Sequence, residues 1–121
     1  MLRAREGPLP ANVRPVGWVP LLARLPHADA IVHHGGAGTV LAALAFGVPQ
    51  LAIPGPGDRR HNAELVARRG AGLMDAPLPA TITRLLADAS LRAAAADVLA
   101  EIAATPDPTD VVAAILAGVS R

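Results

Sequence analysis

A short apolar run that ends directly in a cluster of glycines is the feature that most constrains this chain. Residues 29–33 have the sequence Asp-Ala-Ile-Val-His, and the glycines begin at Gly35. A short apolar run of this kind is typical of a strand that is buried on both faces of a parallel sheet. Residues 39–46 then have the Ala- and Leu-rich composition of a helix, which Gly47 and Pro49 end. The segment therefore predicts a strand, a tight turn and a helix in direct succession.

The rest of the chain repeats this alternation of strands and helices before it changes to helices only. The expected strands are 12–19 (a strand and its exit), 50–53 and 72–74. The expected helices are 20–25, which Pro26 stops, 62–69, which Gly70 ends, and 81–89. Two more helices are expected, one from Ser90 as N-cap to residue 104 and one from Asp107 or Thr109 to residue 116. Strands joined by helices through short links predict a parallel sheet with right-handed crossovers. We therefore expect an α/β fold, a partial Rossmann-like domain with a short parallel sheet flanked by helices and with C-terminal helices covering it.

The turn after the run 29–33 has the composition of an anion-binding site. Small residues let the backbone approach a phosphate closely, and the first N–H groups of a helix point outward unpaired. The helix macrodipole adds about half a positive charge at that end. Thr39 can offer a hydroxyl and His34 an imidazole N–H to the same anion. Such donors would bind the diphosphate more strongly as it departs than in the ground state, because negative charge grows on its oxygens during departure.

Two other glycine motifs also bind phosphate. A P-loop requires Lys, and the chain contains none, so a P-loop is excluded. The dinucleotide fingerprint requires a third glycine, but the segment that begins Gly36-Ala37-Gly38 has Leu41 in that place. Asp58 follows about 20 residues on, where a ribose ligand is expected, yet it comes after a Pro/Gly loop instead of closing a strand. A dinucleotide site is therefore the weaker alternative.

The composition of the chain excludes several classes of function. Its 11 basic residues are scattered, its formal net charge is +1, and aromatic residues make up only 2% of the chain. Without a basic run or aromatic stacking platforms, no nucleic-acid partner is expected. The absence of Cys excludes disulfides, thiolate metal sites and a cysteine nucleophile. The sequence predicts no metal and no other cofactor.

One uncharged run, residues 35–57, is long enough to be considered as a membrane span. Pro49 and Gln50 interrupt it, and a Pro/Gly loop at 54–57 closes it. A helix, a tight turn and a buried strand explain the run better, so no membrane association is expected. The chain does not open with a charged region followed by an apolar one, and a cytoplasmic location is predicted.

Four segments of the chain occur in a characteristic order. They are Gly17-Trp18-Val19-Pro20-Leu21, His33 to Thr39, Gly47-Val48-Pro49-Gln50, and Asp58 with Asn62-Ala63. Together they resemble the C-terminal signature of family 1-like glycosyltransferases of the GT-B fold, which have two facing Rossmann-like domains. The resemblance is greatest to the bacterial enzymes that glycosylate macrolides, glycopeptides and other natural products. It covers residues 12–116, and the ordered set is far more specific than any single segment.

The resemblance implies a site for a nucleotide-sugar donor. In the family, the residue at His34 contacts the diphosphate, and the glycines and the hydroxyl at Thr39 add further contacts. The position of Trp18 lies beside the nucleobase, and that of Asp58 lies near the sugar hydroxyls. The expected donor-binding residues are therefore Trp18, Val19, His34, Gly35, Gly36, Ala37, Gly38, Thr39, Asp58 and Arg59. No residue of this chain is expected to be catalytic.

Two departures from the family pattern bear on the donor. Many relatives have Gln after the Asp, whereas this chain has Arg59, which is charged and cannot accept a hydrogen bond. A sugar other than plain glucose is therefore expected. Relatives that use uridine donors often have a Glu that bonds both ribose hydroxyls, and this chain has Ala42 in that place. A thymidine donor, with a 2′-deoxyribose, would not need the Glu, so we predict a dTDP-deoxysugar.

Less specific interpretations of the same residues stay open at the level of sequence. Trp18 is alternatively a core residue that caps the sheet, Asp58 is alternatively only the cap of the following helix, and Arg59 alternatively faces solvent. Of the two adjacent histidines, we expect His33 to be a buried histidine with satisfied hydrogen bonds and His34 to be the ligand.

In the family, the acceptor site and the catalytic base lie in an N-terminal domain, which has no counterpart in this chain. Residues 1–11 are expected to form a flexible lead and residues 12–121 a donor-binding domain, incomplete as a catalyst alone, with the small-molecule acceptor bound through the missing domain. Open alternatives are a non-catalytic nucleotide-sugar-binding or interaction subunit that works with a separate acceptor-domain chain, a sensing module and, less favoured, an epimerase. A sheet without its leading strands has an exposed edge, which predicts a partner chain or a homo-oligomer.

Overall fold

The fold is built on a three-stranded parallel sheet. This computed structural model describes residues 7–119, so the predicted flexible lead, 1–11, lies partly outside the described residues. The strands are β1 (Ile31–His33), β2 (Gln50–Ala52) and β3 (Gly72–Met74), in that order across the sheet. The predicted α/β fold with a short parallel sheet is confirmed.

Each pair of neighbouring strands is joined by one helix. α2 (Ala37–Ala45) follows β1, and α3 (Arg59–Arg69) follows β2. Both helices start earlier than predicted, because their first turns carry glycine or polar residues and lack the apolar periodicity that marks a helix in a sequence. The turn after β1 is therefore shorter than expected, and Gly38 and Thr39 belong to the first turn of α2.

Both crossover helices end at a glycine, as predicted. Gly47 and Gly70 have φ values of +65° and +79°, in the left-handed region that glycine adopts without a steric penalty. After α3, the N–H of Ala71 donates to the carbonyl oxygen of Val66 at 3.2 Å. The N–H of Gly70 also donates to the carbonyl oxygens of Val66 and Ala67, so the carbonyls at this helix end are paired where the chain turns into β3.

Three helices follow the sheet, namely α4 (Pro79–Ala87), α5 (Ala89–Ala103) and α6 (Pro108–Val119). The side chain of Asp88 accepts a hydrogen bond from the N–H of Ser90 at 2.9 Å, so Asp88 caps α5. The prediction of Ser90 as the N-cap is wrong. Asp and Ser cap helices about equally well, so the sequence alone did not separate them.

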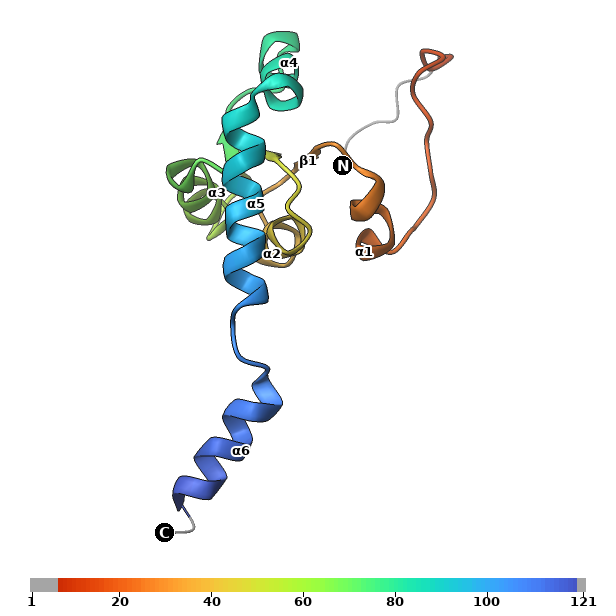
Figure 1. The fold of residues 1–121 in the computed structure, drawn as a ribbon. Helices are drawn as coiled ribbons and strands as arrows, with labels where there is room; N and C mark the ends of the chain where they lie inside the picture. Colours follow the sequence, from red (N-terminus) through yellow and green to blue (C-terminus); the bar gives the residue numbers. More distant parts are fainter. Residues whose placement is uncertain (1–6, 120–121) are drawn as a thin grey trace.

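The core lies between the sheet and helices α2 to α5. One buried cluster consists of Val40, Val66, Ala71 and Ala95, and a second of Leu51, Leu85 and Leu91. Leu85 of α4 and Leu91 of α5 therefore pack on Leu51 of β2, so these two C-terminal helices cover part of the sheet, and α5 also lies against α2. α6 differs, because none of its residues, all of them described, is buried, and the helix extends away from the sheet (Figure 1).

The segment before β1 departs from the prediction. Residues 12–19, all described, contain no strand. Pro15 offers no N–H to a ladder, and no described strand lies beside the outer side of β1. α1 (Leu21–Arg24) then runs directly into a 3₁₀ turn, η1 (Leu25–His27). Pro26 therefore does not stop the helical path, since it lies in the first turn of η1, where its missing N–H is not needed.

One helical stretch of the described chain, 89–119, is long and apolar enough to cross a membrane by length and composition alone, which is a weak indication. Residues 104–107 interrupt this stretch between α5 and α6. Each of the two helices is shorter than the roughly 20 residues that a span needs. The uncharged run 35–57 contains α2, a turn and β2, which confirms the sequence-based interpretation.

Candidate functional site

Gly35 connects β1 to α2 and lies against the first turn of α3. Its φ is +89°, and a Cβ atom added to it would lie 2.7 Å from the carbonyl oxygen of Arg59. Real Cβ atoms do not come so close to a backbone oxygen, so only glycine fits here without a shift of α3. This contact brings together two segments that the sequence predicts as parts of one site, 34–39 and 58–59.

The N-terminus of α2 presents backbone donors without acceptors. Gly36 is the N-cap residue and provides no side-chain cap. Within residues 7–119, the N–H groups of Ala37, Gly38 and Thr39 have no hydrogen-bond acceptor, and the N–H of Val40 is the first to pair. A Cβ atom on Gly38 would meet no atom within 4 Å, so the space beside these donors is open. Free N–H groups and the macrodipole at this end of the helix favour an anion.

His34 lies at the same end of α2 and is exposed. A Cβ atom on Gly36 would lie 2.9 Å from Cε1 and 3.0 Å from Nε2 of the His34 ring, so the imidazole lies over Gly36. Thr39, in the first turn of α2, carries the predicted hydroxyl. The imidazole and the hydroxyl add side-chain donors to the backbone donors of the helix.

His33 has a hydrogen bond at both ring nitrogens, as predicted, but it is half-buried and not fully buried as expected. Nδ1 accepts from the N–H of Gly35 at 2.9 Å, and Nε2 lies 2.8 Å from Oε1 of Gln50. Because the N–H of Gly35 can only donate, the network assigns the proton to Nε2, which donates to Gln50. Burial lowers the pKa of His33; the bond to Gln50 opposes this effect, and the neighbouring His34 adds to it. Because Nδ1 accepts a hydrogen bond and carries no proton, the ring is neutral in this arrangement, and His33 supports the turn instead of facing the open space.

Two residues that support the turn received no role from the sequence, Gln50 and Asn62. Gln50 is 1% exposed, and its side-chain amide donates to the carbonyl oxygen of Val40 at 3.5 Å. Nδ2 of Asn62 donates to the carbonyl oxygen of Gly35 at 3.1 Å. A Gln at the start of an apolar strand is a usable signal, because a buried amide needs a partner. No comparable signal marks Asn62, whose partner is 27 residues away.

Asp58 and Arg59 lie at the start of α3. Asp58 is the N-cap residue, but its backbone is helical (φ −68°, ψ −13°) and its carboxylate accepts no hydrogen bond from any described residue. The alternative that Asp58 only caps the helix is therefore wrong, and its exposed carboxylate is free. Arg59 is half-buried, and a Cβ atom on Gly55 would lie 2.8 Å from its Nη1, so its side chain folds over the Pro/Gly loop.

Trp18 and Val19 lie in the segment that precedes α1. Trp18 is 91% exposed, so the alternative that it is a core residue is wrong. Val19 is half-buried. The indole has almost no packing contact with the described chain, which leaves its faces open for stacking. The structure thus gathers the glycine turn, Asp58 and Arg59, but does not pack Trp18 among them.

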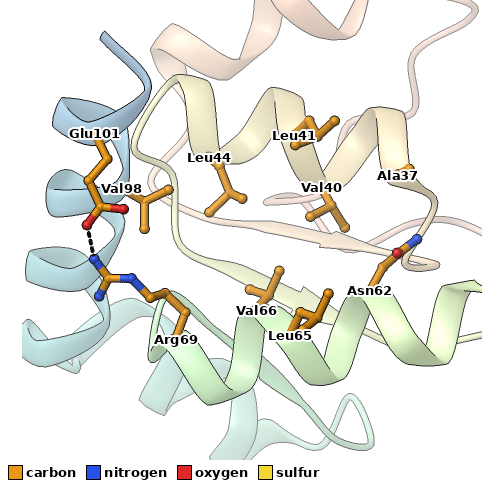
Figure 2. Close-up of a pocket in the computed structure, with 10 residues that line it drawn as sticks. All are labelled: Ala37, Val40, Leu41, Leu44, Asn62, Leu65, Val66, Arg69, Val98 and Glu101. Carbon is orange, nitrogen blue, oxygen red and sulfur yellow. Dashed lines mark hydrogen bonds and ion pairs between the residues drawn. The ribbon is translucent and has the colours of Figure 1, made fainter. Parts of the chain in front are cut away.

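A cavity of about 370 Å³ lies between α2, α3 and α5 (Figure 2). Its lining is mostly apolar, with Leu41 and Leu65 on opposite helices and an ion pair between Arg69 and Glu101 at one end. Of the predicted donor-binding residues, Ala37 alone lines it. The cavity therefore adjoins the candidate site without coinciding with it. Within residues 7–119, no three His, Asp or Glu side chains are grouped as metal ligands.

Known proteins match the chain in family, sequence and structure. Residues 2–117 match the protein family described as erythromycin biosynthesis protein CIII-like, C-terminal domain. Elloramycin glycosyltransferase ElmGT of Streptomyces olivaceus is 49% identical over 110 residues, which cover 90% of this chain and 29% of that protein. The glycosyltransferase SnogD from Streptomyces nogalater matches in structure with a TM-score of 0.83 at 44% identity, over 94% of this chain and 32% of that one. The glycosyltransferase VinC in complex with dTDP matches with a TM-score of 0.83 at 43% identity, over 91% of this chain and 30% of that one. The chain thus spans about a third of the length of these relatives.

Proposed function

Since the chain belongs to the family of erythromycin biosynthesis protein CIII-like C-terminal domains, found in natural-product glycosyltransferases, we propose that it binds the nucleotide-sugar donor of such an enzyme. The complete reaction would transfer the sugar to a hydroxyl group of a small natural product, as in antibiotic biosynthesis. In this reaction, the chain would hold the donor and stabilise the nucleoside diphosphate that leaves.

The observation that carries this proposal is the open N-terminus of α2. Three features meet there: N–H groups of residues 37–39 that have no acceptor in the described chain, the open space beside Gly38, and the exposed His34. In the proposal, the diphosphate accepts hydrogen bonds from these N–H groups, from the His34 imidazole and from the Thr39 hydroxyl. Because negative charge grows on the diphosphate as the sugar departs, the donors stabilise the transition state more than the bound donor.

The rest of the donor would lie along the residues beside this turn. The free carboxylate of Asp58 is suited to accept hydrogen bonds from sugar hydroxyls, with Arg59 next to it on α3. The exposed indole of Trp18 is suited to stack on the nucleobase, with Val19 beside it. The absence of a cap bond at Asp58 supports this assignment, because the described chain makes no other use of the carboxylate.

We propose a dTDP-deoxysugar as the donor. Ala42 lies where relatives that use uridine donors often carry a Glu for both ribose hydroxyls, and a 2′-deoxyribose has no use for that Glu. The glycosyltransferase VinC, similar in sequence and fold, is solved in complex with dTDP. Arg59, in the place of a Gln that reads sugar hydroxyls, favours a sugar other than plain glucose.

We further propose that residues 12–121 form the donor-binding domain, and that the acceptor site and the catalytic base belong to an N-terminal domain. The 121 residues by themselves are expected to bind donor and to transfer nothing. The alternative is a non-catalytic donor-binding subunit that works with a separate acceptor-domain chain. The expected location is the cytoplasm.

Titration of the chain with dTDP and with UDP, followed by backbone amide NMR, tests the proposal. We expect the signals of residues 35–39 to shift, and to do so at lower concentrations of dTDP than of UDP. Shifts that spare this segment would contradict the donor site. Tighter binding of UDP would contradict only the choice of nucleotide. A transfer assay with and without the N-terminal half of a relative then distinguishes a domain from a subunit.

A further inference from the structure

Side chains hold the backbone of Gly35 on both of its sides. Its N–H donates to Nδ1 of His33 at 2.9 Å, and its carbonyl oxygen accepts from Nδ2 of Asn62 at 3.1 Å. On the far side of the His33 ring, Nε2 donates to Oε1 of Gln50 at 2.8 Å. A continuous series of hydrogen bonds therefore runs from β2 through β1 and the turn to α3.

We propose that His33, Gln50 and Asn62 are positioning residues, which hold Gly35 in one conformation and thereby aim the free N–H groups of α2 at the diphosphate. The inference rests on the proposed function. None of the three side chains needs to touch the donor, because each acts through the backbone of Gly35.

The turn needs such support because glycine is the least restricted residue. At φ +89°, Gly35 has many alternative conformations open to it, and steric exclusion does not make the turn rigid. An anion site works best when its donors already point at the anion, since reorienting them costs free energy. A hydrogen bond to the N–H and another to the carbonyl oxygen of the same residue restrict both of its backbone dihedrals.

Gln50 determines which nitrogen of His33 carries the proton. Its Oε1 can only accept, so it favours the tautomer with the proton on Nε2. Nδ1 then remains the acceptor that the buried N–H of Gly35 requires. The carbonyl oxygen of Val40, 3.5 Å from Nε2 of Gln50, orients the side-chain amide so that its oxygen faces His33. The opposite tautomer of His33 would place two N–H groups face to face.

Two variants of the chain test this inference, with Leu65→Ala as a matched control. Asn62→Ala removes the donor to Gly35, and Gln50→Leu removes the acceptor for His33 while keeping a similar volume. Leu65 lies on the same helix as Asn62 and lines the same cavity, but its side chain has no polar atom for the turn. In calorimetry with dTDP, we expect Asn62→Ala to weaken binding about three- to tenfold, which corresponds to the net free energy of one hydrogen bond. Leu65→Ala is expected to change binding by less than about twofold.

The protonation of His33 provides a readout that a purely structural role would not change. In NMR of the imidazole nitrogens, wild-type His33 is expected to carry its proton on Nε2, and Gln50→Leu is expected to populate both tautomers. A wild type that does not bind dTDP overturns the proposed function and this inference with it. Wild-type binding that Asn62→Ala and Gln50→Leu leave unchanged overturns the inference alone. The inference alone is also overturned if Gln50→Leu retains both the wild-type tautomer and the wild-type amide signal of Gly35.

Discussion

Replacing Gly38 by alanine tests the proposed donor site without disturbing the fold. The Cβ atom of a helical residue tilts toward the N-terminus of its helix, so the new methyl group would point into the space proposed for the diphosphate. In the free chain that space is open, since no atom lies within 4 Å of the added Cβ. Alanine is also the better helix former, so the variant should be as stable as the wild type or up to about 1 kcal/mol more stable.

The loss of binding in Gly38→Ala follows from how closely an anion must approach. A phosphate oxygen bonded to the N–H of Gly38 would lie about 2.9 Å from that nitrogen, and a methyl group on the same residue competes for this space. Losing one charge-assisted hydrogen bond costs about 1.5–3 kcal/mol, which weakens dTDP binding about ten- to hundredfold.

Gly35→Ala provides the contrast, because here the methyl group meets the protein itself. The added Cβ would lie 2.7 Å from the carbonyl oxygen of Arg59, and the backbone is left-handed at φ +89°. The left-handed conformation costs a non-glycine residue about 1–2 kcal/mol, and the forced shift of α3 costs about 1–3 kcal/mol more. We therefore expect the free energy of unfolding to fall by about 2–5 kcal/mol, a large part of the total for a domain of this size.

Urea unfolding followed by circular dichroism measures both stabilities, and calorimetry with dTDP measures binding. The expected pattern is a stable Gly38→Ala that binds dTDP weakly and a Gly35→Ala that is poorly folded. If Gly38→Ala binds dTDP as tightly as the wild type, the diphosphate lies elsewhere and the reasoning is refuted. If Gly38→Ala is as unstable as Gly35→Ala, the space beside residue 38 is not open.

Three further predictions concern single features of the chain. Burial lowers the pKa of His33, so below its ordinary pKa of about 6.5 the unfolded chain takes up a proton that the folded chain refuses. The free energy of unfolding should therefore be highest above about pH 6.5 and fall as the pH falls below it. Urea unfolding at several pH values should show this fall in the wild type but not in His33→Gln. Because the Asp58 carboxylate caps no described residue, Asp58→Ala should leave the melting temperature unchanged, whereas loss of a true cap would cost about 1 kcal/mol. The same variant should weaken the binding of a dTDP-sugar more than the binding of dTDP. Within the described residues β1 has a neighbour on one side only, and Val32 is 46% exposed. We expect sedimentation to show self-association that Val32→Lys reduces, and a wild-type monomer at high concentration would contradict this.

Elements with local signals were predictable from the sequence. The strand at 72–74 has its predicted bounds, and Gly47 and Gly70 end their helices because their left-handed backbones require glycine. The strand expected at 12–19 does not form, because a strand needs a neighbour and the apolar residues of this segment have none among the described strands. The N-cap of α5 was misplaced by two residues for a different reason, since two good capping side chains stand close together.

In the candidate site, too, some features were predictable from local sequence signals and others were not. His34, Gly38 and Thr39 fall within one continuous segment, and their place at the start of a helix follows from that segment alone. Whether Asp58 caps α3 was left open by the sequence, because the same residue type serves both roles. The structure decided this question, because the carboxylate of Asp58 accepts no hydrogen bond from any described residue.

By itself, then, the sequence determined the strand, the glycine turn, the helix and the donor groups of a candidate anion site, because these follow from the types and backbone preferences of consecutive residues. Only the tertiary structure decided that α3 lies against Gly35 and that Gln50 and Asn62 support the turn. The physical reason is distance along the chain. His33 and Gln50 are 17 residues apart and Gly35 and Asn62 are 27 apart, so these partners meet only once the sheet and its crossover helices have formed.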